Sequence, residues 1–149
     1  MVYLDYSATT PVEKEVLDYF VDISNKYIAN PNSLHELGKE AKEYIDKCSS
    51  SILELLNLKD HEVIYTSGSS EANNLAIKGL ANKYKSNGKH IITTYMEHPS
   101  ITAPFSYLQK EGFTIDIVNL DSNGIVDLEH LKSLLREDTI LVSIGSVNS

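Results

Sequence analysis

Residues Glu62 to Thr94, with the sequence EVIYTSGSSEANNLAIKGLANKYKSNGKHIITT, contain the pattern that decides the fold. Glu62–Thr66 predicts a short buried strand, and His90–Thr94 predicts a second one. Between them, a Gly/Ser turn at Ser67 leads into a helix that ends near Lys85. A strand, a helix and a second strand in this order predict parallel strands joined by a crossover helix.

The same alternation continues toward the C-terminus. Helices are predicted at Pro99–Lys110 and at Leu128–Leu135, the second capped by Asp127, and strands at Phe113–Val118 and Thr139–Ile144. Four alternations predict an α/β fold with a mostly parallel sheet and flanking helices on both faces. In such sheets ligands bind beyond the carboxyl ends of the strands. The corresponding loops here are Ser67–Glu71, Tyr95–Ser100, Asn119–Gly124 and Gly145–Ser149.

Two helices are predicted before this region. Thr10 and Pro11 form a typical helix start, and apolar residues then recur at helical spacing as far as Ile23. Asn30-Pro31 interrupts this pattern. A second helix is predicted from Leu34 to Leu56, with Ser33 as its cap and Glu36 completing a capping box.

Composition excludes several classes of function. The 149 residues fit one ordinary domain, and 21 acidic against 13 basic residues give a net charge of −8. This charge argues against a nucleic-acid footprint and against a polybasic membrane contact. No apolar run has the length of a membrane span, and Met1–Asp5 carries no signal-peptide pattern, so a cytoplasmic protein is expected.

The sequence offers few groups for metal or thiol chemistry. Cys48 is the only cysteine and lies on the apolar stripe of a predicted helix, which favours a small core residue over a nucleophile. Glu97 and His98 have no second His or Cys at ligand spacing, so no metal site is expected. The remaining histidines are interpreted as structural or surface residues without partners: His35, His61, His90 and His130.

Two short segments offer candidate binding or catalytic groups. Ser69 and Ser70 follow Gly68 at a predicted helix start, where hydroxyl and backbone N–H groups can hold a phosphate. A plain helix cap explains the same residues, and from local sequence alone it is the simpler interpretation. His98, after the strand His90–Thr94, is either an acid–base group or a loop residue that caps the next helix.

Taken together, several segments resemble the cysteine desulfurases, the NifS/IscS-like members of the class V aminotransferases. The resemblance runs from about Tyr3 to Ser149. Its motifs are LDYSATTP (4–11), NPNSLH (30–35), YTSGSSEANNLAIKG (65–79), GKHIIT (88–93), EH (97–98), NG (123–124) and DTILVS (138–143).

The resemblance implies a fold and a reaction. The fold is the first part of the large domain of fold type I (aspartate aminotransferase-like) enzymes, which depend on pyridoxal 5′-phosphate (PLP). The family removes sulfur from L-cysteine, leaves alanine, and passes a persulfide sulfur to acceptor proteins of iron–sulfur cluster or thiolation pathways. Its members are homodimers with the active site at the subunit interface.

The resemblance also implies roles for particular residues. Ser69 and Ser70 match the turn that holds the cofactor phosphate, and His98 matches a His that stacks on the pyridine ring and takes part in proton transfer. Asn148 matches a cofactor-binding Asn, whereas Ser149 stands where the family usually has a second Asn. The family's Schiff-base Lys and catalytic Cys have no match, since Lys78, Lys89 and Cys48 fall outside those motifs.

These expectations divide the chain into an N-terminal arm and helix, residues 1–32, and the first part of the PLP-binding domain, residues 33–149. The end at Ser149 directly after a predicted strand indicates a truncated chain, which is expected to be inactive alone. Two alternatives stay open. One is a selenocysteine lyase or another class V aminotransferase, and the other is a non-enzymatic flavodoxin-like module that binds anions.

Overall fold

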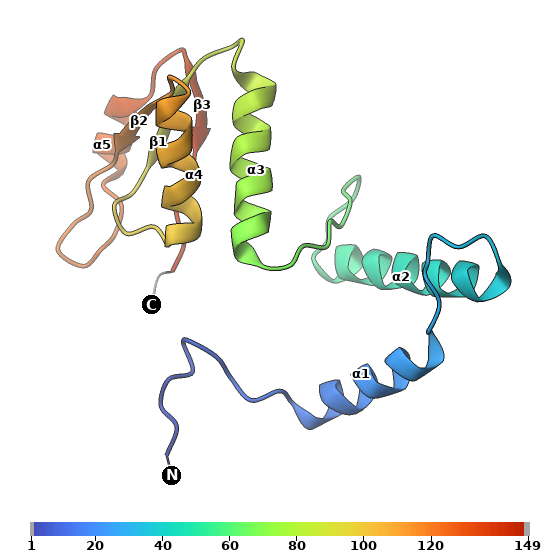
Figure 1. The fold of residues 1–149 in the computed structure, drawn as a ribbon. Helices are drawn as coiled ribbons and strands as arrows, with labels where there is room; N and C mark the ends of the chain where they lie inside the picture. The colour runs from blue at the N-terminus through green and yellow to red at the C-terminus, as the bar shows by residue number, and fades with distance from the viewer. Residues whose placement is uncertain (1, 148–149) are drawn as a thin grey trace. The chain divides into compact units, whose positions relative to one another are not determined.

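The structure of this chain is a computed structural model that describes residues 2–147 (Figure 1). The described residues form five helices and three strands: α1 (Lys14–Lys26), α2 (Glu36–Leu55), α3 (Ser69–Tyr84), β1 (His90–Thr93), α4 (Pro99–Lys110), β2 (Thr114–Ile117), α5 (Leu128–Leu134) and β3 (Thr139–Val142). The chain divides into two compact units, the first ending at Tyr65 and the second beginning at Thr66. All three strands therefore belong to the second unit.

The second unit is built on a parallel sheet with the strand order β2-β1-β3. β1 is the central strand, and all four of its residues are buried. α3 and α4 pack side by side (Figure 1). The apolar core consists of residues from these two helices and β1, together with Phe113 just before β2. The buried core residues are Ile77, Ala81, Ile91, Phe105, Leu108 and Phe113. The predicted α/β fold with a parallel sheet and flanking helices is confirmed.

The connections between strands place a crevice at one edge of this sheet. β1 connects to β2 through α4, and β2 connects back past β1 to β3 through α5. Right-handed crossovers that run in opposite directions place α4 and α5 on opposite faces of the sheet. In open α/β sheets, ligands bind where neighbouring strands lead to opposite faces, beyond the carboxyl ends. That point lies between β1 and β2.

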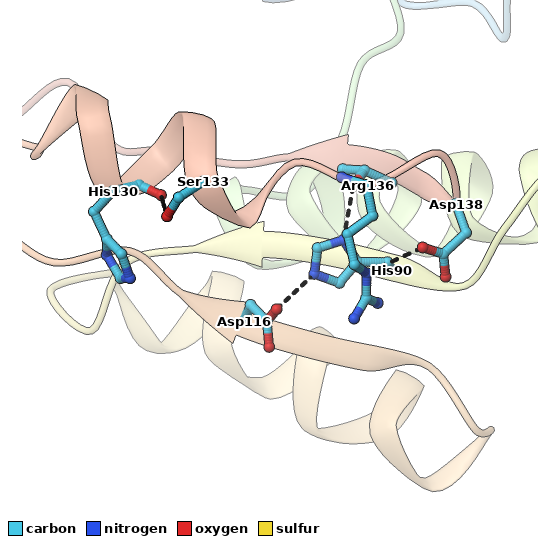
Figure 2. Close-up of polar contacts among 7 residues, drawn as sticks. His90, Asp116, His130, Ser133, Arg136 and Asp138 are labelled. Carbon is cyan, nitrogen blue, oxygen red and sulfur yellow. Dashed lines mark hydrogen bonds and ion pairs between the residues drawn. The ribbon is translucent and has the colours of Figure 1, made fainter.

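A buried histidine at the start of β1 contacts side chains of both neighbouring strands (Figure 2). His90 is fully buried, and its Nε2 lies 3.0 Å from Oδ2 of Asp116 on β2. Its Nδ1 lies 2.7 Å from Oγ1 of Thr139 on β3, and that hydroxyl oxygen accepts a hydrogen bond from the backbone N–H of Arg136. An ionised carboxylate only accepts, so Nε2 carries a proton and donates to Asp116. In the neutral ring Nδ1 is then the acceptor, and the Thr139 hydroxyl donates to it.

The first unit contains α1 and α2. Tyr44 of α2 is its aromatic centre, because it stacks on Tyr27 with ring centroids 4.4 Å apart and shares a hydrogen bond with the Tyr19 hydroxyl. That hydrogen bond and, secondarily, desolvation raise the pKa of Tyr44. α1 has no buried residue, and large apolar side chains such as Val16 and Phe20 are exposed on it.

Several local predictions were wrong. Glu62–Thr66 is not a strand, because no described strand pairs with it, so the described sheet has three strands and not four. The cap predicted at Thr10 is also absent, since α1 begins later, at Lys14 after Glu13.

The cap predicted at Ser33 for the second helix was wrong as well. The Asn30–Ser33 segment folds into its own turn, in which the N–H of Ser33 donates to the carbonyl of Asn30 at 2.9 Å. His35 caps α2 in its place, with Nδ1 accepting from the N–H of Gly38. The other predicted elements agree with the structure to within about two residues at each end, and Asp127 caps α5 as predicted.

The histidine that joins the strands gives a stability prediction. Replacing Thr139 with Val removes the hydroxyl that His90 and the Arg136 N–H both use, and we expect a loss of about 1–2 kcal/mol in the free energy of unfolding of the second unit. Thr114→Val is the matched control, because Thr114 lies exposed on β2, and a change within about 0.5 kcal/mol is expected. Hydrogen exchange of the β1 amides measures both variants, and equal effects would refute the proposed role of His90.

Candidate functional site

A cleft of about 550 Å³ opens at the carboxyl ends of the three strands, within the volume range of small-molecule sites. Each strand contributes the loop that follows it, and α3 contributes its N-terminal turns. The lining residues are Ser69, Asn73, Thr94, Met96, Glu97, His98, Ser100, Ile101, Leu120, Asn123, Gly124, Val126, Ser143, Ile144, Gly145, Ser146 and Val147. None of these is a lysine or an arginine, so helix-end dipoles are the main source of positive potential toward an anion in this cleft.

The N-terminus of α3 is open toward an anion. Its cap residue is Gly68, which has no side chain to satisfy the first N–H groups of the helix. Within residues 2–147, no hydrogen bond engages the N–H groups of Ser69, Ser70 or Glu71. Both serines are exposed, so hydroxyl and N–H donors converge at the positive end of the helix dipole. This arrangement favours the anion-site interpretation over that of a closed cap.

The acidic residue in the first turn of α3 binds the turn that precedes the helix. Oε2 of Glu71 accepts hydrogen bonds from the backbone N–H and the hydroxyl of Ser67, both at 2.7 Å. The backbone bond from Ser67, followed by the hydroxyl bond, lowers the pKa of Glu71 below its ordinary value. Glu71 therefore orders the turn before α3 and leaves the N–H groups of Ser69 and Ser70 available.

His98 both caps a helix and lines the cleft. Its Nδ1 lies 3.1 Å from the backbone nitrogen of Ser100 and 2.9 Å from the Ser100 hydroxyl oxygen, which makes His98 the N-cap of α4. The ring itself is exposed to the cleft. The two interpretations of His98 from sequence are therefore compatible, because Nδ1 serves the cap and Nε2 is left at the opposite ring edge.

The sequence indicated no contact role for Glu97, which appears there only in the EH motif and as a residue without nearby metal ligands. Its Oε1 accepts from the hydroxyl of Thr94 at 2.9 Å and from the backbone N–H of Gly145 at 2.8 Å. Gly145 follows β3, 48 residues further along the chain. Glu97 thus ties the loop after β1 to the segment after β3, a contact that only the parallel sheet makes possible.

The remaining predictions concern Asn148, metal ligands, Cys48 and membrane-spanning helices. Asn148, the predicted cofactor-binding residue, and Ser149 lie outside the described residues. No group of three or more potential metal ligands occurs within residues 2–147. Cys48 is a half-buried free thiol on α2. No helix in the described part of the chain has the length and hydropathy needed to cross a bilayer.

The prediction that the remaining histidines lack partners was wrong. His90 contacts Asp116 and Thr139, and His130 accepts a hydrogen bond at Nδ1 from the backbone N–H of Asn119 at 2.9 Å. His61 lies 2.5 Å from the carbonyl of Lys59. These partners are two to 49 residues away in sequence, and most of them come together only in the folded chain. The interpretation of these histidines as structural residues is consistent with these contacts.

The residues of the cleft fit the cofactor that the family resemblance implies. A phosphate requires several converging donors, and the open end of α3 provides unengaged N–H groups beside two hydroxyls. A planar ring requires a flat partner, and His98 presents an exposed imidazole in the same cleft. The donor set thus suits a phosphorylated aromatic ligand.

Comparisons with known proteins agree on one family. The sequence matches the family described as Aminotransferase class-V over residues 2–149. The cysteine desulfurase IscS of Neisseria meningitidis serogroup C (strain 053442) is 43% identical over 149 residues, which cover 99% of this chain and 37% of that protein. The chain therefore spans little more than a third of the length of this curated relative.

Solved structures give the same result. A NifS-like protein superposes with a TM-score of 0.87 at 36% identity, covering 92% of this chain and 38% of the other. The structure described as SspA in complex with cysteine superposes with a TM-score of 0.88 at 33% identity, covering 98% of this chain and 42% of the other.

The lowered pKa of Glu71 gives a pH prediction for the turn before α3. A carboxyl group with a lowered pKa in the folded state stabilises the fold fully at pH values above its ordinary pKa of 4.5. This stabilisation is lost as the pH falls through the lower pKa of the folded state. We therefore expect hydrogen exchange of the Ser67 amide at pH 7 to be slower in the native chain than in Glu71→Gln. At a pH below the folded-state pKa of Glu71, the two exchange rates should be equal. Glu62→Gln, an exposed carboxylate before the turn, is the control and should match the native chain at both pH values. No difference at pH 7 would show that Glu71 does not order this turn.

Proposed function

The chain belongs to the Aminotransferase class-V family, and we propose that it supplies part of the active site of a PLP-dependent cysteine desulfurase. The observation that carries this proposal is the meeting of an open helix N-terminus and an exposed histidine in one cleft. The curated relatives named as cysteine desulfurases support the choice of reaction within the family.

We propose that the cofactor binds across this cleft. Ser69 and Ser70 would hold its phosphate through hydroxyl and N–H groups, and His98 would lie against its ring. Asn148 would contact the cofactor from the segment after β3. PLP, when bound, withdraws electrons from the substrate carbon next to the amino group.

The chain's own groups would orient these partners and control protons. Nδ1 of His98 is occupied by the cap of α4, so the ring would hold or exchange a proton at Nε2. Glu97 would fix the path of the chain toward Asn148, because it holds the N–H of Gly145. The apolar lining residues Ile101, Leu120 and Val126 would exclude water from one side of the cleft.

The proposed substrate is L-cysteine, which would yield L-alanine and a sulfur atom carried as a persulfide. One solved neighbour is described in complex with cysteine, which supports this choice. Residues 1–149 match neither the Schiff-base Lys nor the catalytic Cys of the family, so we expect no turnover from these residues alone. Sulfur-acceptor proteins, a homodimer and a cytoplasmic location belong to the same proposal for the whole protein.

A second candidate is a selenocysteine lyase or another class V reaction. Ser149 favours it, because a serine replaces the asparagine that the family usually has at that position. Serine is shorter and lacks the amide donor, which alters the contacts available to a substrate carboxylate.

Activity of the whole protein tests the proposal. With PLP and L-cysteine, we expect equal amounts of alanine and reducible sulfur, and we expect His98→Ala to lower kcat about 10²- to 10⁴-fold, the contribution typical of a positioned acid–base group. His61→Ala is the matched control, since His61 is exposed in the first unit, and it should retain the native rate.

Three results would contradict this account. Preference for L-selenocysteine over L-cysteine would favour the second candidate. Absence of alanine from either amino acid would refute both. An unchanged rate in His98→Ala would remove His98 from the mechanism.

A further inference from the structure

A buried serine links the two halves of the candidate site. Ser100 is only 7% exposed, and its hydroxyl oxygen lies 2.8 Å from Nδ2 of Asn73 on α3 and 2.9 Å from Nδ1 of His98 before α4. Asn73 is four residues after Ser69, within the N-terminal turns of α3 where the phosphate is proposed to bind. The three side chains therefore connect the open end of α3 to the ring of His98.

The chemistry of these groups sets the direction of the hydrogen bonds. The amide nitrogen of Asn73 can only donate, so the Ser100 oxygen accepts from it and its own proton is free to point at His98. The backbone N–H of Ser100 also donates to the same Nδ1, at 3.1 Å. Two donors facing one nitrogen require that this nitrogen carries no proton in the neutral ring.

The neutral ring must then carry its proton on Nε2. No hydrogen bond of Nε2 is found within residues 2–147, and the ring is exposed in the cleft. A donor at this edge suits a ligand oxygen, whether of a phenolate or of a carboxylate. Fixing the ring before the ligand arrives also removes the cost of ordering it on binding.

We propose that Ser100 and Asn73 are positioning residues that hold His98 in the Nε2–H tautomer and set its distance from the anion site on α3. This inference rests on the proposed function only for the role of His98 toward a bound cofactor. The tautomer and its dependence on Ser100 and Asn73 are properties of this chain alone.

Nitrogen-15 NMR of the histidine rings tests this in the chain itself, without cofactor, at about pH 8.5, where an ordinary imidazole is neutral. Two other histidines serve as internal references. His35 accepts at Nδ1 from the N–H of Gly38 and should show the Nε2–H form. His61 faces the Lys59 carbonyl through Nδ1 and should show the Nδ1–H form.

We expect the ring-nitrogen chemical shifts of His98 to match those of His35, which indicates the Nε2–H tautomer. Ser100→Ala removes one of two donors to Nδ1 and should lower the ratio of Nε2–H to Nδ1–H about fivefold, the size typical of one hydrogen bond. Asn73→Asp replaces the amide donor by an acceptor, which draws the Ser100 proton away from His98, and should have a similar effect. Ser100→Thr keeps the hydroxyl and should restore the native ratio.

The outcomes separate this inference from the proposed function. Finding His98 in the Nδ1–H form overturns the positioning role of Ser100 and Asn73. A tautomer ratio of His98 that is unchanged in both Ser100→Ala and Asn73→Asp does so as well. Backbone amide spectra that match the native chain establish that each variant is folded, and Asn73→Asp supplies the test if Ser100→Ala does not fold. If the tautomer of His98 depends on Ser100 and Asn73 as expected, but the whole protein produces no alanine from cysteine, the proposed function fails and the positioning role of Ser100 stands.

Discussion

The contacts of His90 fix the sheet on which the rest of the second unit depends. This fully buried ring bridges Asp116 on β2 and Thr139 on β3 from the first residue of the central strand. A buried imidazole is costly unless both of its nitrogens are hydrogen-bonded, so an alignment of the strands that moved Asp116 or Thr139 away from it would be destabilised. The observed alignment brings the three carboxyl ends together at the opposite edge, where the cleft lies.

Polar side chains then arrange the loops beyond the strands. Glu97 holds the segment after β3 against the loop after β1, and Ser100 joins the start of α4 to α3. Glu71 folds back on Ser67 and leaves the first N–H groups of α3 unengaged. The result is a cleft in which one wall provides donors for an anion and another presents an imidazole. Such a pre-formed arrangement requires little reordering when a ligand binds.

Local sequence predicts helix bounds and some caps correctly, but it does not predict contacts between residues that are distant in the chain. α4 follows the predicted bounds because Pro99 starts it and its apolar spacing is regular, and Asp127 caps α5 as a short-range signal predicts. The segment Glu62–Thr66 contains β-forming residues but is not a strand, since such residues make a strand only where a partner strand is available. The bridges from His90 and the contact of Glu97 with Gly145 join residues 26 to 49 apart, which periodicity cannot reveal. The resemblance to cysteine desulfurases identified Ser69, Ser70 and His98 as candidates, and the structure places Ser69 and His98 in one cleft with Ser70 beside Ser69 on α3.

We propose that the open end of α3 and the ring of His98 form one site for a phosphorylated cofactor. Amide NMR of this chain during titration with PLP tests this, with pyridoxal, which lacks the phosphate, as the comparison. We predict that PLP shifts the amides of Ser69, Ser70 and Glu71 together with that of His98, and that pyridoxal leaves the α3 amides unchanged. Shifts confined to exposed lysines, with none at the start of α3, would contradict the account.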